Sequence, residues 1–159
     1  MINEEKAIKA YINTPKTVEF YKKAFEKYNI SGIDQFRWHW SGWAFAGGMF
    51  YLLYRKLYLE AVVYFFVFIL LMPLPLVNLI AWIASGGILP YFVYKRYKKI
   101  KTEVENNLDN PHQQIDVLRE LGGVNKWGIW LAVMLNIAFI GALMYITLVV
   151  STNDFHMNQ

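Results

Sequence analysis

The sequence predicts an all-α membrane protein with three transmembrane helices, one interfacial or re-entrant segment and short cytoplasmic amphipathic helices. Hydrophobic residues make up 56% of the 159-residue chain and aromatic residues 18%, and they gather in long blocks. A single charge lies within residues 57–94 and none within 127–150. The chain contains no cysteine, which excludes disulfides and thiolate chemistry.

Residues 1–37 are expected to form an N-terminal cytoplasmic amphipathic region. Within it, the spacing of Val18, Tyr21, Phe25 and Tyr28 predicts a helix over 17–28 with one apolar stripe. Two interpretations are open: the helix packs on the rest of the protein, or it lies on the membrane surface as a basic amphipathic helix. The first residues lack the pattern of a signal peptide, so we expect the mature chain to start here.

Residues 57–94 are expected to form a transmembrane helical hairpin. A single helix over this block would be about 57 Å long, whereas the hydrocarbon core of a bilayer is about 30 Å thick. The block must therefore fold back, and Pro73 and Pro75 mark the turn. The two predicted spans are 57–72 and 76–94.

Residues 95–126 are expected to form a basic cytoplasmic loop with a short helix. The helix is predicted over 111–121, with Asn110 as its cap, Pro111 in its first turn and Gly122 at its end. Residues 127–150 are the predicted C-terminal transmembrane helix, and 151–159 an external tail. Five cations of the loop are predicted to contact lipid headgroups: Lys95, Arg96, Lys98, Lys99 and Lys101.

The positions of lysine and arginine predict on which side of the membrane each loop lies. The basic loop is expected in the cytoplasm, whereas the turn MPLPLVN and the C-terminal tail contain no cation and are expected outside. If residues 38–56 do not cross the membrane, the N-terminus is cytoplasmic and all sixteen lysines and arginines lie inside. If they do cross, the protein has four transmembrane helices and an external N-terminus. We favour the first model.

The favoured model makes 38–56 an interfacial or re-entrant segment. Its first third contains polar and small residues, which weakens it as a hydrocarbon span, and tryptophan prefers the headgroup region. The predicted interfacial anchors are Trp38, Trp40, Trp43, Arg55 and Lys56.

Several motifs along the chain resemble one family. The segment EFYKKAFEKYNISGIDQFRWHWSGWAFAGGMFYLLYRKLYLEA contains a tyrosine-rich helix, a Trp-polar-Trp block and the signature YRKLY at 54–58, and it is followed later by GILPYFVYKRY and LRELGGVNKW. This order resembles the HrgC-like family of small uncharacterised bacterial integral membrane proteins, over most of residues 18–127. The resemblance implies an integral membrane protein and no established activity or catalytic residue.

The sequence contains no motif for catalysis, cofactor binding or metal binding. There is no Gly-rich phosphate loop and no nucleophile elbow, and the three histidines, His39, His112 and His156, fall in separate regions. No catalytic residue, cofactor or metal is therefore predicted. The positive net charge is placed beside apolar blocks, which favours anionic lipid headgroups over nucleic acid as partners.

Polar side chains within the predicted spans are the candidate functional residues. Glu60 follows Lys56 by four residues, so it forms either an ion pair at the interface or a gate carboxylate. Asn78 and Asn136 either bond neighbouring helices or line a polar path.

Two functional hypotheses follow, from different classes. The first is an accessory or scaffolding subunit of the bacterial inner membrane, which binds a partner membrane protein or a second copy through its membrane helices and its amphipathic segments. The alternative is a homo-oligomeric channel or carrier for ions or small solutes, with Glu60, Asn78 and Asn136 facing a shared axis. An enzyme is disfavoured because no catalytic cluster is found.

Overall fold

The computed structural model describes residues 2–128 and ten positions beyond them: 130, 131, 133, 134, 137, 138, 141, 144, 145 and 147. The chain divides into two compact units, Met1–Asn125 and Lys126–Gln159. In the second unit, the described residues from Trp127 onward have helical backbone. The span expected at 127–150 is therefore described only in part, and Asn136 lies outside the described residues.

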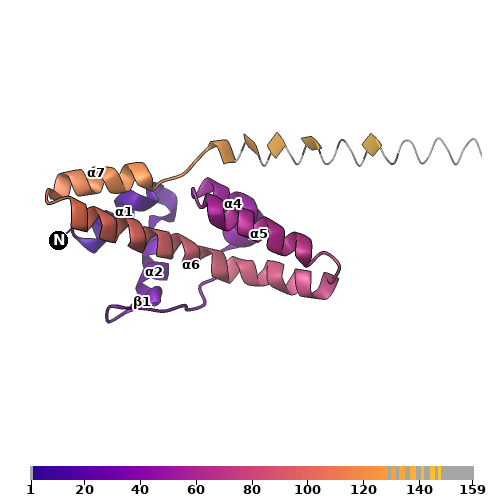
Figure 1. The fold of residues 1–159 in the computed structure, drawn as a ribbon, viewed down its shortest axis with the longest axis horizontal. Coiled ribbons are helices and arrows are strands. Elements are labelled where there is room, and N and C mark those ends of the chain that lie inside the picture. Colours follow the sequence, from indigo (N-terminus) through magenta and orange to yellow (C-terminus); the bar gives the residue numbers. More distant parts are fainter. Residues whose placement is uncertain are drawn as a thin grey trace, which may run out of the picture. The chain divides into compact units, whose positions relative to one another are not determined.

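The first unit is built almost entirely of helices, which confirms the all-α class (Figure 1). A two-stranded antiparallel hairpin is the one sheet among the described residues. In chain order, the elements are α1 (Glu4–Ile12), a 3-10 turn (Pro15–Thr17), α2 (Val18–Tyr28), β1 (Asn29–Ile30), β2 (Ile33–Asp34), α3 (Gly42–Gly47), α4 (Met49–Tyr54), α5 (Tyr58–Leu70), α6 (Pro75–Asn107) and α7 (Pro111–Leu121).

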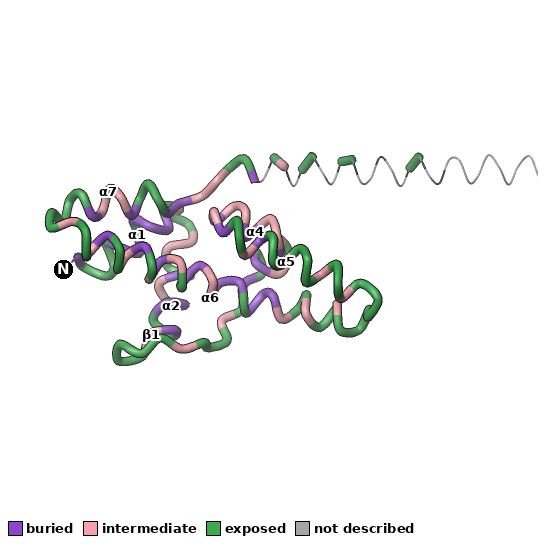
Figure 2. The backbone as a smooth tube through the Cα atoms, in the orientation of Figure 1, coloured by how far each residue is buried: buried purple, intermediate pink, exposed green. Residues whose placement is uncertain are grey.

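The long helix α6 organises the first unit. Its C-terminal half is contacted by α1, α2 and α7 (Figure 1). The helix α3 packs against its N-terminal half. We call α1, α2, the strands β1 and β2 with their turn, α7 and residues 91–107 of α6 the head, and α5, the turn 71–74 and residues 75–90 of α6 the apolar hairpin. Buried positions gather where α1, α2 and α6 meet, whereas exposed positions predominate along the apolar hairpin (Figure 2).

Aromatic side chains of α2 and α6 interlock in the core of the head. Phe25 and Tyr28, one helical turn apart, face α6, where tyrosines recur at 91, 94 and 97. The Phe25 ring lies 5.2 Å from that of Tyr94 and 5.1 Å from that of Tyr97, and the Tyr28 ring lies 5.1 Å from that of Tyr91. The apolar stripe of α2 is thus covered by α6, which corresponds to the packed interpretation of this helix and not to the membrane-surface one.

The helix α7 has the bounds that its end residues predict. The Asn110 side-chain oxygen accepts a hydrogen bond from the His112 amide at 2.9 Å, and the Gly122 amide donates to the Leu118 carbonyl at 3.0 Å. Leu118 is fully buried against the rest of the head. The predicted helix over 111–121 is confirmed; of its apolar residues Ile115, Leu118 and Leu121, Leu118 is fully buried, Ile115 is half-buried and Leu121 is exposed.

The segment 38–56 is divided into two helices of six residues, α3 and α4, on either side of Gly48. Gly48 has a φ of 46°, a conformation that interrupts a helix. A helix of six residues is about 9 Å long, far short of the roughly 30 Å needed to cross the hydrocarbon. A fourth span at this place is therefore not supported.

The expectation of three spans is also not supported. Among the described residues, α6 is the one helix long and apolar enough to cross a membrane, and only 33% of its most apolar stretch is buried. The span expected over 57–72 is shorter than predicted: α5 has 13 residues, because the chain leaves helical geometry at Lys56, with a φ of 61°, and again at the turn before Pro75. The expected span at 76–94 is part of α6, which continues to Asn107.

Candidate functional site

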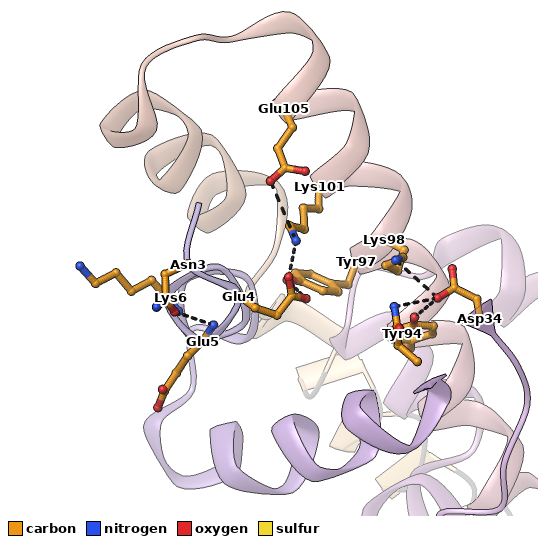
Figure 3. Close-up of polar contacts among 11 residues, drawn as sticks. Asn3, Glu4, Glu5, Lys6, Asp34, Tyr94, Tyr97, Lys98, Lys101 and Glu105 are labelled. Atoms are coloured by element: carbon orange, nitrogen blue, oxygen red, sulfur yellow. Dashed lines mark hydrogen bonds and ion pairs between the residues drawn. The ribbon is translucent and has the colours of Figure 1, made fainter. Parts of the chain in front are cut away.

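Asp34 joins the small β-hairpin to the basic stretch of α6. The Tyr94 hydroxyl donates a hydrogen bond to the Asp34 carboxylate, and the Lys98 ammonium lies 3.4 Å from the same oxygen (Figure 3). Tyr94 and Lys98 are four residues apart and so share one face of the helix. The carboxylate therefore fixes the segment after α2 against α6.

Glu4 makes the equivalent contact from α1, one turn further along α6. The Tyr97 hydroxyl donates to one Glu4 oxygen at 2.9 Å, and the Lys101 ammonium contacts the other (Figure 3). Glu105 adds a second carboxylate to Lys101 at 3.9 Å. Burial, and then the nearby Glu4 carboxylate, raise the pKa of Tyr97.

The five cations predicted to contact lipid differ in their contacts within the protein. Lys98 and Lys101 pair with carboxylates of the head, and Arg96 donates to the Lys56 carbonyl. Lys95 and Lys99 are exposed on α6, and no ion pair of theirs is found among the described residues. Contact with headgroups stays a prediction, and it now applies mainly to these two lysines.

Arg55 lies inside the protein, with 5% of its surface exposed. Its guanidinium donates to the Ile12 carbonyl at the end of α1 and to the Thr17 hydroxyl, both at 3.2 Å, and it lies 4.5 Å from the centre of the Tyr21 ring. Carbonyls at a helix C-terminus and aromatic faces both stabilise a cation. Arg55 therefore joins α1, α2 and α4, and in this arrangement it does not reach lipid headgroups as an interfacial anchor would.

Two of the three tryptophans in the segment 38–43, Trp38 and Trp40, lie on two glycines of α6. A Cβ atom added at Gly86 would lie 2.5 Å from the Trp40 ring nitrogen, and one at Gly87 would lie 2.8 Å from the Trp38 ring. The Trp40 ring nitrogen also donates to a carbonyl of α6, at 3.4 Å. Trp43 is 79% exposed. The glycine pair thus lets an aromatic segment pack closely on the helix.

A groove of about 700 Å³ lies between α1, the turn that follows it and α7. Three cations line it, Lys6 and Lys9 from α1 and Arg119 from α7, together with His112 and one carboxylate, Asp116. Arg119 and Asp116 lie 3.5 Å apart, whereas no ion pair of Lys6 or Lys9 is found among the described residues. The groove therefore has the charge to attract an acidic group.

The apolar hairpin exposes large hydrophobic side chains around both of its helices. Apolar patches of more than a few hundred Å² on a protein surface indicate contact with a membrane or another protein. The exposed residues include Leu59, Val62, Val63, Phe66, Leu70, Met72, Leu74, Leu76, Val77, Leu79, Ile80 and Ile83. The surface of the apolar hairpin is therefore better suited to contact with lipid or protein than with water.

Comparison with protein families gives one match, over residues 6–84, to a family described as "Protein of unknown function (DUF2628)". A DUF2628 domain covers this part of the chain. It extends from α1 into the first third of α6 and so includes Arg55, the tryptophan segment and the tip of the apolar hairpin. No HrgC-like family is named by the match, and searches among curated proteins and solved structures found no match.

Within the DUF2628 domain, the candidate polar residues have separate surroundings. Asn78 donates from its side chain to the Phe68 carbonyl at 3.3 Å, which is the helix-to-helix bond considered for it. Glu60 lies at one end of an apolar groove between α5 and α6. It forms no ion pair with Lys56, because the helix is broken between them and Lys56 donates instead to the Glu120 carbonyl at 3.0 Å.

The structure does not bring these residues into one reactive site. Within the part of the chain that is described, no three His, Asp or Glu side chains gather as metal ligands would. Sequence reasoning missed the buried contact between the Tyr21 and Tyr51 hydroxyls, at 2.7 Å, beneath Arg55. The available signal was the signature YRKLY itself, whose arginine directly follows the short aromatic helix α4.

Proposed function

We propose that the protein is an accessory membrane protein: the apolar hairpin anchors it in the bilayer, and the head binds a partner. The exposed hydrophobic surface of the apolar hairpin carries this proposal. Residues 75–84 of α6 are apolar and largely exposed, whereas residues 91–107 are covered by the charged helices of the head. This difference between the two ends of α6 supports insertion of the apolar hairpin and not of the head.

The partner is expected to present acidic groups to the groove between α1 and α7. Lys6 and Lys9 line one wall of the groove, and no carboxylate among the described residues lies within ion-pair distance of them, so a partner carboxylate would meet unpaired charge. The apolar side of α2, and Leu118 of α7, are buried inside the head. The groove therefore replaces these amphipathic sides as the docking surface that we propose.

The proposed location is the inner membrane of a bacterium, with the head in the cytoplasm and the C-terminus outside. The distribution of lysine and arginine supports this orientation, since none follows Lys126. A partner membrane protein or a second copy of the chain would complete the assembly.

Purification in mild detergent would test the accessory role. We expect a stable complex with a second polypeptide, and no ion flux through liposomes that contain the protein. Reversal of the groove charge by Lys6→Glu with Lys9→Glu should remove the partner and leave the protein in the membrane. Lys23→Glu, on the exposed side of α2, is the matched control and should change neither property.

The competing hypothesis, a homo-oligomeric channel, predicts the opposite results. It requires a symmetric oligomer of this chain alone and a flux that Glu60→Gln alters. The bond from Asn78 to the Phe68 carbonyl gives that side chain a partner within the hairpin, which argues against its lining a pore.

A further inference from the structure

The tip of the apolar hairpin is apolar on every side. Between Glu60 and Asn78, the Tyr64 hydroxyl is the one polar side-chain group. Leu70, Met72 and Leu76 at the tip are each 75–76% exposed. A turn that emerges into water on the far side of a membrane normally contains polar residues, and this one contains none.

The backbone of the tip is also suited to hydrocarbon. Each unpaired backbone donor or acceptor in the bilayer core costs several kcal/mol. Pro73 and Pro75 have no amide hydrogen, and the amides of Leu71, Met72 and Leu74 donate to carbonyls three or four residues back, at 2.9–3.1 Å. The turn therefore presents few free donors to its surroundings.

The tryptophan segment marks a depth along α6. Tryptophan rings prefer the interface between headgroups and hydrocarbon, and Trp38 and Trp40 lie against Gly87 and Gly86. From Pro75 to Gly86 the helix rises about 17 Å, which is little more than half of a hydrocarbon core of about 30 Å. On the far side of the glycines, α6 continues to the exposed Lys95 and Lys99, which suit anionic headgroups.

These observations, together with the membrane anchor proposed above, on which this inference rests, point to one arrangement. We infer that the apolar hairpin is re-entrant: it enters and leaves the bilayer on the face where the head lies, and its tip at 71–75 stops near the midplane. Its partner is the acyl-chain region of a single leaflet. In this arrangement the turn lies within the bilayer, whereas the sequence alone predicted an external turn.

Single-cysteine variants can measure the depth of the tip, because the natural chain contains no cysteine. A nitroxide would be attached at Met72→Cys in the tip and, as the matched control, at Ser31→Cys in the exposed turn of the head, in liposomes that contain anionic lipid. We expect the Met72 label to collide with oxygen and to be shielded from a nickel chelate added on both sides. The Ser31 label should be open to the chelate.

Each other outcome has a distinct meaning. A Met72 label that is open to the chelate only from the face opposite to Ser31 would show two full spans; this result overturns the re-entrant hairpin but leaves the membrane anchor intact. A Met72 label that is open to the chelate on the same face as Ser31 would show that the hairpin does not insert, and the proposed function would fail with it.

A charge at the tip gives a second measurement. Leu74→Lys should raise the accessibility of the Met72 label to the nickel chelate by roughly tenfold or more, since a lysine deep in hydrocarbon is strongly disfavoured. Ile33→Lys, in the exposed strand β2, should leave that accessibility unchanged. A Met72 label whose accessibility Leu74→Lys does not change would overturn the inference.

Discussion

Replacing Phe25 by alanine tests the aromatic core of the head. The ring is 3% exposed and lies within 5.8 Å of the rings of Tyr21, Tyr94 and Tyr97. Burial of a phenylalanine side chain stabilises a protein by about 1.5–3 kcal/mol, and each aromatic pair adds about 0.5–1.5 kcal/mol. Phe25→Ala should thus lower the free energy of unfolding by at least about 3 kcal/mol, within the range of about 3–5 kcal/mol seen for such changes.

Thermal unfolding in mild detergent, followed by near-ultraviolet circular dichroism of the stacked tyrosines, would measure this loss. For a domain of this size, we expect the midpoint to fall by at least about 10 °C. Phe66→Ala removes the same atoms from an exposed position on α5 and is the control, with an expected change in the head of less than about 1 kcal/mol. Equal losses in the two variants would refute the packing of α2 on α6 described above.

Three further predictions concern other contacts. Gly122→Ala should lower the unfolding midpoint, because its Cβ atom would lie 2.3 Å from the Tyr11 carbonyl oxygen, a backbone atom, whereas Gly42→Ala meets nothing closer than 3.7 Å and should not. Burial raises the pKa of Tyr11 and Tyr97, so the folded head keeps protons that the unfolded chain releases near pH 10. The free energy of unfolding should therefore fall as the pH rises above about 10. The absorbance of tyrosinate from these two residues should appear only when the head unfolds. Asn78→Leu should cost about 0.6–1 kcal/mol in detergent unfolding without reducing membrane integration, and a loss of integration would contradict a purely bracing role.

The sequence predicted the features that local chemistry determines. Asn110, Pro111 and Gly122 act within a few residues of themselves, so the bounds of α7 could be read directly. The turn at Pro73 and Pro75 and the apolar stripe of α2 are equally local. The continuation of α6 beyond residue 94 was not predicted, although the sequence favours it. Residues 95–107 contain neither glycine nor proline and are rich in lysine, which has a high helix propensity.

The remaining features depend on contacts between distant parts of the chain. Arg55 has the pattern of a cation flanking a membrane segment, but the Ile12 carbonyl and the Tyr21 ring, far away in sequence, give it a buried site. The pairing of Lys56 with Glu60 was wrong, because a spacing of four brings side chains together only on an unbroken helix. The groove between α1 and α7 joins residues about one hundred positions apart, and no periodicity reports it.

The packing of α1 against α7 also sets an order for synthesis. Ile8, Tyr11 and Ile12 are buried in the head, and α7, which packs on α1, is translated about one hundred residues later. The two helices of the apolar hairpin, by contrast, are neighbours in the chain and can pair as soon as they are made. During translation, the side of α1 that packs on α7 therefore stays uncovered until the ribosome has passed residue 121, so the apolar hairpin can reach the lipid before the head is complete.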